Sequence, residues 1–331
     1  MRTGVIGAGG LGHHHIRILR DLQGPDFAGF YESRPDRAAA VAKELGVRAF
    51  ESLDALLDAV DAVTIVVPTP AHFDVAKRVL SRGIHALIEK PIAATLAEAD
   101  EMLSLARTHG ALIQTGHVER FNRAIRAALP YVEAPRFIQS DRLAPFNPRG
   151  ADVAVVLDLM IHDIDLVLTL VGGHAASVHA VGVPVLTPFV DIANARLTFD
   201  SGAVANITAS RVSRERMRKL RIFQQSGYLS LDLGAGNGEF YRLRGDLDMT
   251  ALATAPLALE QFVERIPLEA DEGDALRLEF ESFLAGVRGE SPIPVTGEAG
   301  REALGVALQI VADIERSLPS LAGGAALPAR A

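Results

Sequence analysis

Near its start the chain reads Thr3-Gly4-Val5-Ile6-Gly7-Ala8-Gly9-Gly10-Leu11-Gly12. A short apolar segment thus leads into glycines spaced G-x-G-x-x-G, and a helix-like segment follows. In this arrangement Gly7 permits a tight turn, Gly9 lets a pyrophosphate approach the backbone, and Gly12 lets the helix pack against the strand. The N–H groups at the helix start, at Gly10 and Leu11, would face the phosphates. The run therefore predicts a dinucleotide-binding turn.

An acidic residue stands where such a site needs one. Glu32 lies twenty residues after Gly12, at the end of the next apolar segment, where a carboxylate can accept both hydroxyls of the adenosine ribose. This favours NAD, because the charge of Glu32 would repel a 2′-phosphate. Arg34 lies close by and could offset that repulsion, so NADP stays open as an alternative.

Short apolar segments alternate with amphipathic ones in the first third of the chain, which predicts an α/β Rossmann domain with a parallel sheet. The expected strands are Thr3–Ile6, Phe27–Tyr31, Ala62–Val67, His85–Ile88 and Ala111–Thr115. The expected helices are Leu11–Leu22, Arg37–Glu44, Leu53–Asp58, Ala71–Ser81 and Leu96–Thr108.

The pattern changes after Gly116, where an α+β domain with an open, mostly antiparallel sheet is expected. The expected strands are Ser177–Val183, Asp191–Phe199, Ala203–Ser210, Lys219–Phe223, Tyr228–Leu233 and Glu239–Arg242. The expected helices are Val153–Leu170, Ala275–Val287 and Gly300–Ser317. We predict a domain over residues 1–118, a second over 119–317 and a disordered tail over 318–331.

Composition limits the class of protein. The 331 residues contain no cysteine, which excludes disulfides, thiolate catalysis and cysteine-ligated zinc, and the net charge of −8 argues against nucleic-acid binding. Four polar or charged groups interrupt the most apolar stretch, Val153 to Val171, so no membrane span is expected. The strand-like N-terminus leaves no room for a signal peptide, and we expect a cytoplasmic protein.

Lys90 is the first candidate catalytic residue. The sequence Ile88-Glu89-Lys90-Pro91 closes the fourth expected strand, and ligands of open α/β sheets bind beyond the carboxyl ends of the strands. A lysine there can donate a hydrogen bond to a substrate hydroxyl or exchange protons if its pKa is lowered. The alternative is a surface lysine before a helix that begins with proline.

Asp158, His162 and Asp165 form a second candidate group, because their i, i+4 and i+7 spacing puts them on one face of a helix. A histidine beside a carboxylate suits general base catalysis near neutral pH. A metal site and a structural hydrogen-bonded cluster remain alternatives. The run His13-His14-His15 is not expected to bind metal, because consecutive helix residues point in different directions.

These motifs together resemble the Gfo/Idh/MocA family of oxidoreductases over nearly the whole chain. The resemblance rests on the glycine pattern extended to His15, on Thr69-Pro70-x-His72, on Glu89-Lys90-Pro91 and on Asp158-x-x-x-His162-x-x-Asp165. It implies Lys90 and His162 at the reacting carbon with Asp158 or Asp165 beside them. It also implies that Thr69, Pro70, His72 and Glu89 border the cofactor, and that an open-faced sheet mediates oligomerisation. Met160 departs from the family pattern, which often has glycine there, and would narrow the pocket.

Two stretches, Gly116–Asn122 and Leu157–Asp165, resemble a branch of the family that oxidises C3 of UDP-N-acetylglucosamine. The resemblance implies an NAD-dependent oxidation of a sugar hydroxyl, with substrate contacts at Lys90, His117, Arg120, Asp158, His162 and Asp165. A basic run from Arg211 to Arg221 could hold a diphosphate or could be a solvated face. A dehydrogenase of free inositols or aldoses, an NAD-recycling glycosidase and an NAD-sensing protein remain alternatives. We expect a homodimer or homotetramer.

Overall fold

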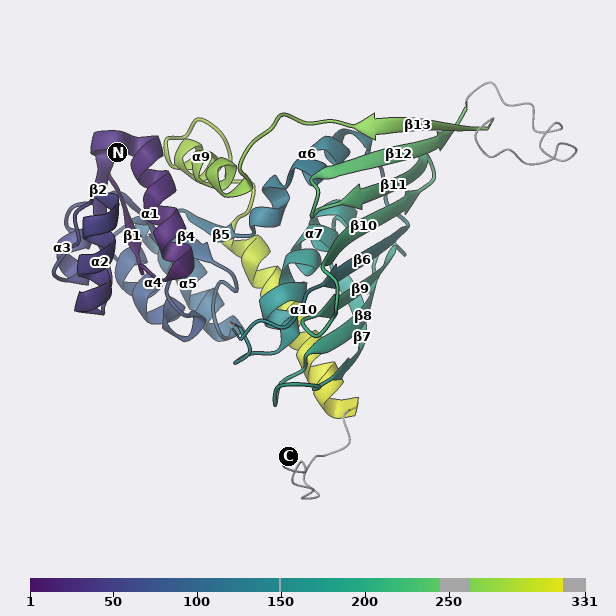
Figure 1. Cartoon of the computed structure of the whole chain (residues 1–331), viewed down its shortest axis with the longest axis horizontal. Coiled ribbons are helices and arrows are strands. Elements are labelled where there is room, and N and C mark those ends of the chain that lie inside the picture. The colour runs from purple at the N-terminus through teal and green to yellow at the C-terminus, as the bar shows by residue number, and fades with distance from the viewer. Residues whose placement is uncertain (149, 245–261, 318–331) are drawn as a thin grey trace, which may run out of the picture. The chain divides into compact units, whose positions relative to one another are not determined.

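Two compact units make up the chain (Figure 1). The computed structural model describes residues 1–148, 150–244 and 262–317. The first unit contains Met1–Asn122 and Asp271–Gly305, and the second contains Arg123–Ala270 and the residues from Val306 onward. The late helical segment 271–305 therefore belongs with the N-terminal part of the chain. The predicted disordered tail lies outside the described residues.

A five-stranded parallel sheet forms the centre of the first unit, in the order β2-β1-β3-β4-β5, which confirms the predicted Rossmann-like architecture. The strands are β1 (Thr3–Ile6), β2 (Phe27–Tyr31), β3 (Ala62–Ile65), β4 (His85–Glu89) and β5 (Ile113–Gly116). Nearly all their residues are buried, as expected for a sheet covered on both faces. The carboxyl ends of all five strands meet at one edge of the sheet.

Helices complete the first unit close to the predicted positions (Figure 1). They are α1 (Gly10–Gln23), α2 (Pro35–Leu45), α3 (Leu53–Leu57), α4 (His72–Leu80), α5 (Leu96–His109) and α9 (Ala275–Val287). Phe280 and Phe283 of α9 pack into the same core cluster as Ile16 and Leu19 of α1. This packing explains why a segment so late in the sequence joins the first unit.

The second unit contains an eight-stranded sheet in the order β13-β12-β11-β10-β6-β9-β8-β7, which confirms the predicted mostly antiparallel sheet. Among the described strands of this second sheet, only the β6–β9 pair is parallel. The strands are β6 (Phe137–Leu143), β7 (Ala175–Val183), β8 (Ile192–Phe199), β9 (Val204–Ser210), β10 (Met217–Gln224), β11 (Gly227–Asp232), β12 (Asn237–Leu243) and β13 (Val263–Leu268).

Helices of the second unit cover one face of this sheet (Figure 1). Helix α6 (Arg123–Ala128) contacts β11 and β12, and α7 (Ile161–Val171) contacts β6 and β9. The last helix, α10 (Gly297–Ser317), begins in the first unit and ends in the second. None of the helices in the described part of the chain combines the length and the apolar character needed to cross a bilayer.

The structure differs from the sequence prediction before α7. A single predicted helix over Val153–Leu170 is instead a π-helical turn over Val156–Met160 followed by α7. The wider π turn changes the direction in which its side chains point, and such turns often occur at functional sites. Asp158 lies inside this turn, and His162 follows two residues after its end.

Candidate active site

The glycine turn after β1 has the geometry that a dinucleotide requires. Gly7 has a φ of 98°, and a Cβ there would lie 2.6 Å from the carbonyl oxygen of Val66. A Cβ on Gly12 would lie 2.2 Å from the carbonyl oxygen of Gly7, so only glycine lets α1 approach the turn so closely. A Cβ on Gly9 would meet no atom within 4 Å. The open side of the turn is therefore at Gly9, where a pyrophosphate fits.

The carboxylate of Glu32 lies beside this turn. Its Oε2 accepts a hydrogen bond of 2.8 Å from the main-chain N–H of Ala8, and its Oε1 accepts one of 3.0 Å from Nε of Arg34. Burial works to raise the pKa of Glu32, but the bonds from Arg34 and Ala8 outweigh it and the pKa lies below its ordinary value. An ionised carboxylate thus stands at the end of β2, where an adenosine ribose would be bound.

Lys90 follows directly on β4, joined to Pro91 by a cis peptide bond, and is half-buried. The preceding Glu89 is 8% exposed, and its Oε1 lies 3.2 Å from Nε2 of the fully buried His15. Burial works to raise the pKa of Glu89, whereas His15 and Lys90 lower it, and the balance leaves it below its ordinary value. Lys90 therefore stands at the carboxyl edge of the sheet, next to the buried carboxylate of Glu89.

His72 supports the loops that follow β3 and β4. It is 1% exposed, with Nδ1 2.9 Å from the carbonyl oxygen of Pro91 and Nε2 2.9 Å from that of Val67. Burial lowers the pKa of His72. The 3₁₀ turn Thr69–Ala71, just before it, leaves Thr69 half-buried and Pro70 exposed. In this structure His72 contacts backbone, whereas Thr69 and Pro70 lie on the outer side of the loop.

His117 and Arg120 stand at the end of β5. His117 is fully buried, and Arg120 is half-buried in the 3₁₀ turn Val118–Phe121. Nη1 of Arg120 donates a hydrogen bond of 3.1 Å to the carbonyl oxygen of Pro294, a residue of the same unit. The first unit thus collects the glycine turn, Thr69, Lys90 and His117 at the carboxyl edge of one parallel sheet, because each follows one of its strands.

In the second unit, Asp158 and His162 are half-buried, whereas Asp165 is only 1% exposed. The prediction that the three share one face assumed an unbroken α-helix, whereas Asp158 lies in the π turn and His162 and Asp165 lie on α7. The carboxylate of Asp158 lies over Gly150, where a Cβ would come within 2.6 Å of Oδ2. Among the described residues, no three histidine, aspartate or glutamate side chains are grouped as a metal site would need. Met160 is fully buried.

Sequence reasoning missed a buried ion pair beside His162. Asp163 is 1% exposed and accepts hydrogen bonds of 2.5 Å from Nε of Arg142 and 2.8 Å from Oγ of Ser140. Arg142 and Ser140 come from β6, so this cluster fixes the start of α7 on the sheet. A signal was present, because Asp163 interrupts a long apolar segment, but its partner lay in a strand that was not predicted.

The residues of the basic run from Arg211 to Arg221 differ in how far they are buried. Arg211 is 3% exposed, and its guanidinium donates hydrogen bonds to the carbonyl oxygens of Gly150 and Val153. It therefore fixes the loop that leads to the π turn and is not accessible to a diphosphate. Arg214, Arg216, Arg218 and Lys219 are exposed.

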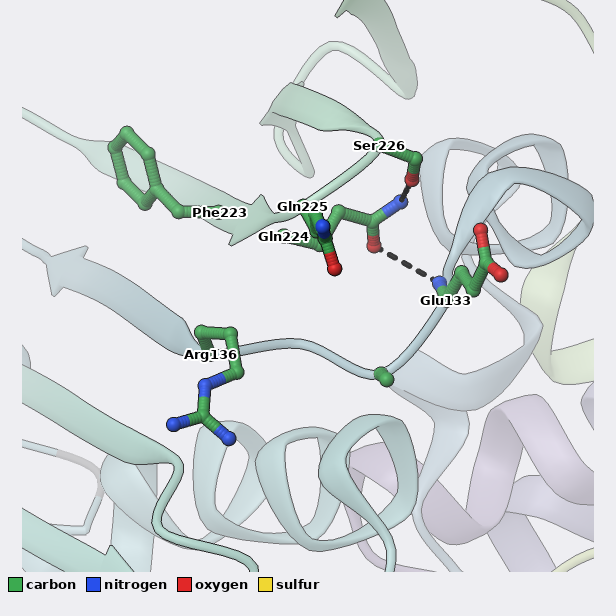
Figure 2. A pocket seen from close by; sticks show the side chains of 7 residues that line it. Glu133, Arg136, Phe223, Gln224, Gln225 and Ser226 are labelled. Atoms are coloured by element: carbon green, nitrogen blue, oxygen red, sulfur yellow. Dashed lines mark hydrogen bonds between the residues drawn. The ribbon is translucent and has the colours of Figure 1, made fainter.

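A pocket in the second unit contains none of the predicted site residues (Figure 2). It lies between the start of β6 and the β10–β11 turn and is lined by Glu133, Ala134, Arg136, Phe223, Gln224, Gln225 and Ser226. The side chain of Gln224 accepts a hydrogen bond from the N–H of Glu133 and donates one to Oγ of Ser226. These contacts join the two loops of the pocket wall.

Comparisons with known proteins agree with this geometry. Residues 1–117 match the model of an oxidoreductase family with an NAD-binding Rossmann fold, and residues 124–230 match the Gfo/Idh/MocA C-terminal domain. The chain is 41% identical over 329 residues to UDP-N-acetylglucosamine 3-dehydrogenase from Acidithiobacillus ferrooxidans, covering 96% of this chain and 98% of the relative. A solved structure of that enzyme superposes with a TM-score of 0.86 at 40% identity, over 96% of this chain and 98% of the other.

A more distant relative is named for a different substrate. The scyllo-inositol 2-dehydrogenase (NAD(+)) of Bacillus subtilis is 29% identical over 232 residues, covering 64% of this chain and 68% of the relative. The open glycine turn and the ionised Glu32 are features that a dinucleotide-binding Rossmann fold requires. The chain belongs to the Gfo/Idh/MocA family of NAD-binding oxidoreductases.

Proposed function

We propose that this protein oxidises the C3 hydroxyl of UDP-N-acetylglucosamine to a ketone, with NAD as the acceptor and in the cytoplasm. The observation that carries the substrate assignment is the identity of 41% along 96% of the chain to an enzyme named for that reaction. The free space at Gly9 and the anionic Glu32 support the cofactor assignment. Ionised Glu32 also favours NAD over NADP, because it would repel a 2′-phosphate.

The chemistry divides between a hydride and a proton. Bound NAD supplies the hydride acceptor for the hydrogen on C3. We assign removal of the hydroxyl proton to His162, with Asp158 supporting it, and the donation of a hydrogen bond to the same oxygen to Lys90. The oxygen keeps the electron pair of its broken O–H bond and forms the C=O bond as the hydride leaves. Glu89, Thr69 and Pro70 would border the cofactor, and His117, Arg120 and Asp165 would contribute to the substrate side.

The experiment is a substrate panel with product identification. Purified protein is mixed with NAD or NADP and with UDP-N-acetylglucosamine, UDP-glucose, free N-acetylglucosamine or an inositol, and reduced cofactor is measured. The proposal expects NADH and a 3-oxo sugar nucleotide from UDP-N-acetylglucosamine alone or by a wide margin. Equal turnover of an inositol would assign the chain to polyol oxidation instead. Sugar conversion without net NADH would indicate a recycled cofactor.

We also propose that a second copy of the chain covers the outward face of the eight-stranded sheet. Four aromatic side chains form a continuous row across this face on neighbouring strands: Phe137, Phe223, Tyr228 and Tyr241. Their ring centroids are 4.7–5.7 Å apart, and Phe223 is 38% exposed. Lys219 and Arg221 on β10, with Asp141 on β6, supply both signs of charge beside the row, so the face can complement itself.

A further inference from the structure

Lys90 is preceded by a carboxylate that the fold keeps away from water. Glu89 ends β4 and is 8% exposed, and its Oε1 lies 3.2 Å from Nε2 of His15. Its Oε2 accepts a weak hydrogen bond of 3.3 Å from the main-chain N–H of Lys90. A Cβ on Gly116 of β5 would stand 3.0 Å from the carboxylate, so the absence of a side chain there makes room for it.

His15 is itself held in place from three elements. It is fully buried on α1, its Nδ1 lies 3.3 Å from Oγ1 of Thr64 on β3, and Phe280 of α9 meets its ring edge-on at a centroid distance of 4.8 Å. A ring fixed in this way can keep the carboxylate of Glu89 in one position. His15 and Glu89 thus form a buried pair that contacts the main-chain N–H of Lys90.

In the described part of the first unit, the titratable groups that act most strongly on Glu89 come from three elements. They are His15 on α1, His72 on α4 and Lys90 after β4. Burial lowers the pKa of His72, which makes it a neutral neighbour at neutral pH. Thr64 on β3, Gly116 on β5 and Phe280 on α9 carry no charge. Lys90 is therefore the cation that a charge at Glu89 affects most directly outside the pair.

We propose that His15 and Glu89 are positioning residues. His15 holds the ionised carboxylate of Glu89 next to Lys90, and this negative charge keeps the amine of Lys90 protonated. An anion close to an amine favours the charged form, and a buried anion is weakly screened by salt. Lys90 then acts as a hydrogen-bond donor to the substrate oxygen, and the proton of the hydroxyl goes to His162. This inference rests on the proposed function for the identity of the substrate, but not for the charge state of Lys90.

The charge state can be measured without substrate, because the chain has only four lysines: Lys43, Lys77, Lys90 and Lys219. Acetic anhydride acetylates amines only in their neutral form. Brief labelling of the intact protein over a series of pH values, read by peptide mass spectrometry, gives a titration curve for each lysine. Lys43, Lys77 and Lys219 serve as internal references. In the wild-type protein we expect Lys90 to titrate at the same pH as the references or above it.

Glu89→Gln removes the charge and keeps the size and shape of the side chain. We expect the Lys90 curve to move about one pH unit lower in this variant while the reference curves stay in place. Glu89→Asp keeps the charge at a greater distance and should move it less. Glu279→Gln, which alters another buried carboxylate of the same unit, is the matched control and should leave the Lys90 curve unchanged.

Two results would overturn the inference. One is a Lys90 curve that is identical in wild-type and folded Glu89→Gln protein. The other is a wild-type Lys90 that titrates below all three references, a result that needs no variant to fold. In the kinetic assay, the alkaline limb of the kcat profile should move with the labelling curve in Glu89→Gln while the acid limb stays. Absence of any turnover with UDP-N-acetylglucosamine would count against the proposed substrate and leave the labelling result to decide this point.

Discussion

The carboxylate of Glu32 accepts a hydrogen bond of 2.8 Å from the main-chain N–H of Ala8, which ties the end of β2 to the glycine turn after β1. Oε1 of the same carboxylate faces Arg34, whose side chain is 62% exposed. The turn and the acidic residue, twenty residues apart in the sequence, therefore act as one structural element. We expect the negative charge fixed at this place to determine which nicotinamide cofactor the fold accepts.

Glu32→Gln should weaken the preference for NAD. The neutral side chain loses its charge-assisted hydrogen bonds to the ribose hydroxyls and no longer repels a 2′-phosphate, so the ratio of kcat/KM for NAD to that for NADP should fall by about tenfold or more. The measurement is initial rates with both cofactors. Glu44→Gln, at an exposed carboxylate of the same unit that pairs with His13, is the control. An unchanged ratio in a folded Glu32→Gln protein would contradict the assignment.

Two glycines of the turn should respond differently to alanine. A Cβ at Gly9 meets nothing within 4 Å, so Gly9→Ala should keep the unfolding temperature but weaken NAD binding by obstructing the pyrophosphate. A Cβ at Gly12 would lie 2.2 Å from the Gly7 carbonyl oxygen, so Gly12→Ala should destabilise the protein by about 1–3 kcal/mol. Calorimetry and titration with NAD measure both effects. Equal losses of stability in the two variants would refute this division of roles.

Much of the first unit could be predicted because the local sequence pattern of each strand and helix agrees with its burial in the fold. Each strand is a short apolar run buried on both faces, and the glycine spacing fixes where β1 ends and α1 begins. The same logic placed Lys90 at a strand end. It did not reveal that Glu89 pairs with His15, because the partner lies on another element and the histidine run gives no sign of which ring is buried.

The second unit was harder to predict where polar residues are buried. Strand β6 reads Phe-Ile-Gln-Ser-Asp-Arg-Leu, and its inward positions include Ser140 and Arg142. Asp163 accepts a hydrogen bond from Ser140 and neutralises the charge of Arg142, so both polar side chains can be buried. Strand β6 therefore lacks the alternation of apolar and polar residues that would predict a strand. Strand β13 contains Pro267, which a sheet tolerates here because β13 is an edge strand. The π turn at Asp158 likewise has no pattern of its own in the sequence.

Loss of the Asp163 carboxylate should strongly lower the free energy of unfolding. Asp163→Ala leaves the guanidinium of Arg142, which is 4% exposed, without its counter-charge, and removal of one partner from a buried pair costs about 3–5 kcal/mol. Urea unfolding gives the loss of stability. The double variant Arg142→Met with Asp163→Leu should recover much of it. The exposed pair Arg277–Glu281 is the comparison, and Glu281→Ala should change stability by less than about 0.5 kcal/mol.

Asp191 should make stability depend on acid pH. Burial works to raise the pKa of Asp191, but N–H donors of Thr187, Leu186 and Val185 outweigh it and the pKa lies below its ordinary value. A carboxyl whose pKa is lower in the folded state stabilises the fold above the unfolded pKa, about 4, and loses that effect as pH falls through the folded pKa.

The stability difference between wild-type protein and Asp191→Asn should accordingly be largest near neutral pH and shrink below about pH 4. Urea unfolding at several pH values measures it. Asp200→Asn, in the turn between β8 and β9, is the exposed control and should show a small difference at every pH. A stability difference between wild-type protein and Asp191→Asn that grows as the pH falls would contradict this prediction.

Phe223→Asp should dissociate the proposed oligomer. The new charge would stand in the middle of the aromatic row on the outward face of the sheet, where a second copy would have to bury it. Light scattering during gel filtration gives the mass of both proteins. Leu112→Asp introduces the same charge at a 40% exposed leucine of the first unit and should leave the mass unchanged. A wild-type protein that is monomeric at micromolar concentration would disprove the interface.

The most direct test of the proposed reaction is the formation of NADH from NAD and UDP-N-acetylglucosamine by the purified protein, followed by identification of the oxidised carbon. We predict one NADH for each 3-oxo sugar nucleotide, and loss of turnover with retained NAD binding in His162→Ala and Lys90→Ala. A protein that binds NAD but does not reduce it with this substrate, or a His162→Ala variant with full activity, would contradict the assignment.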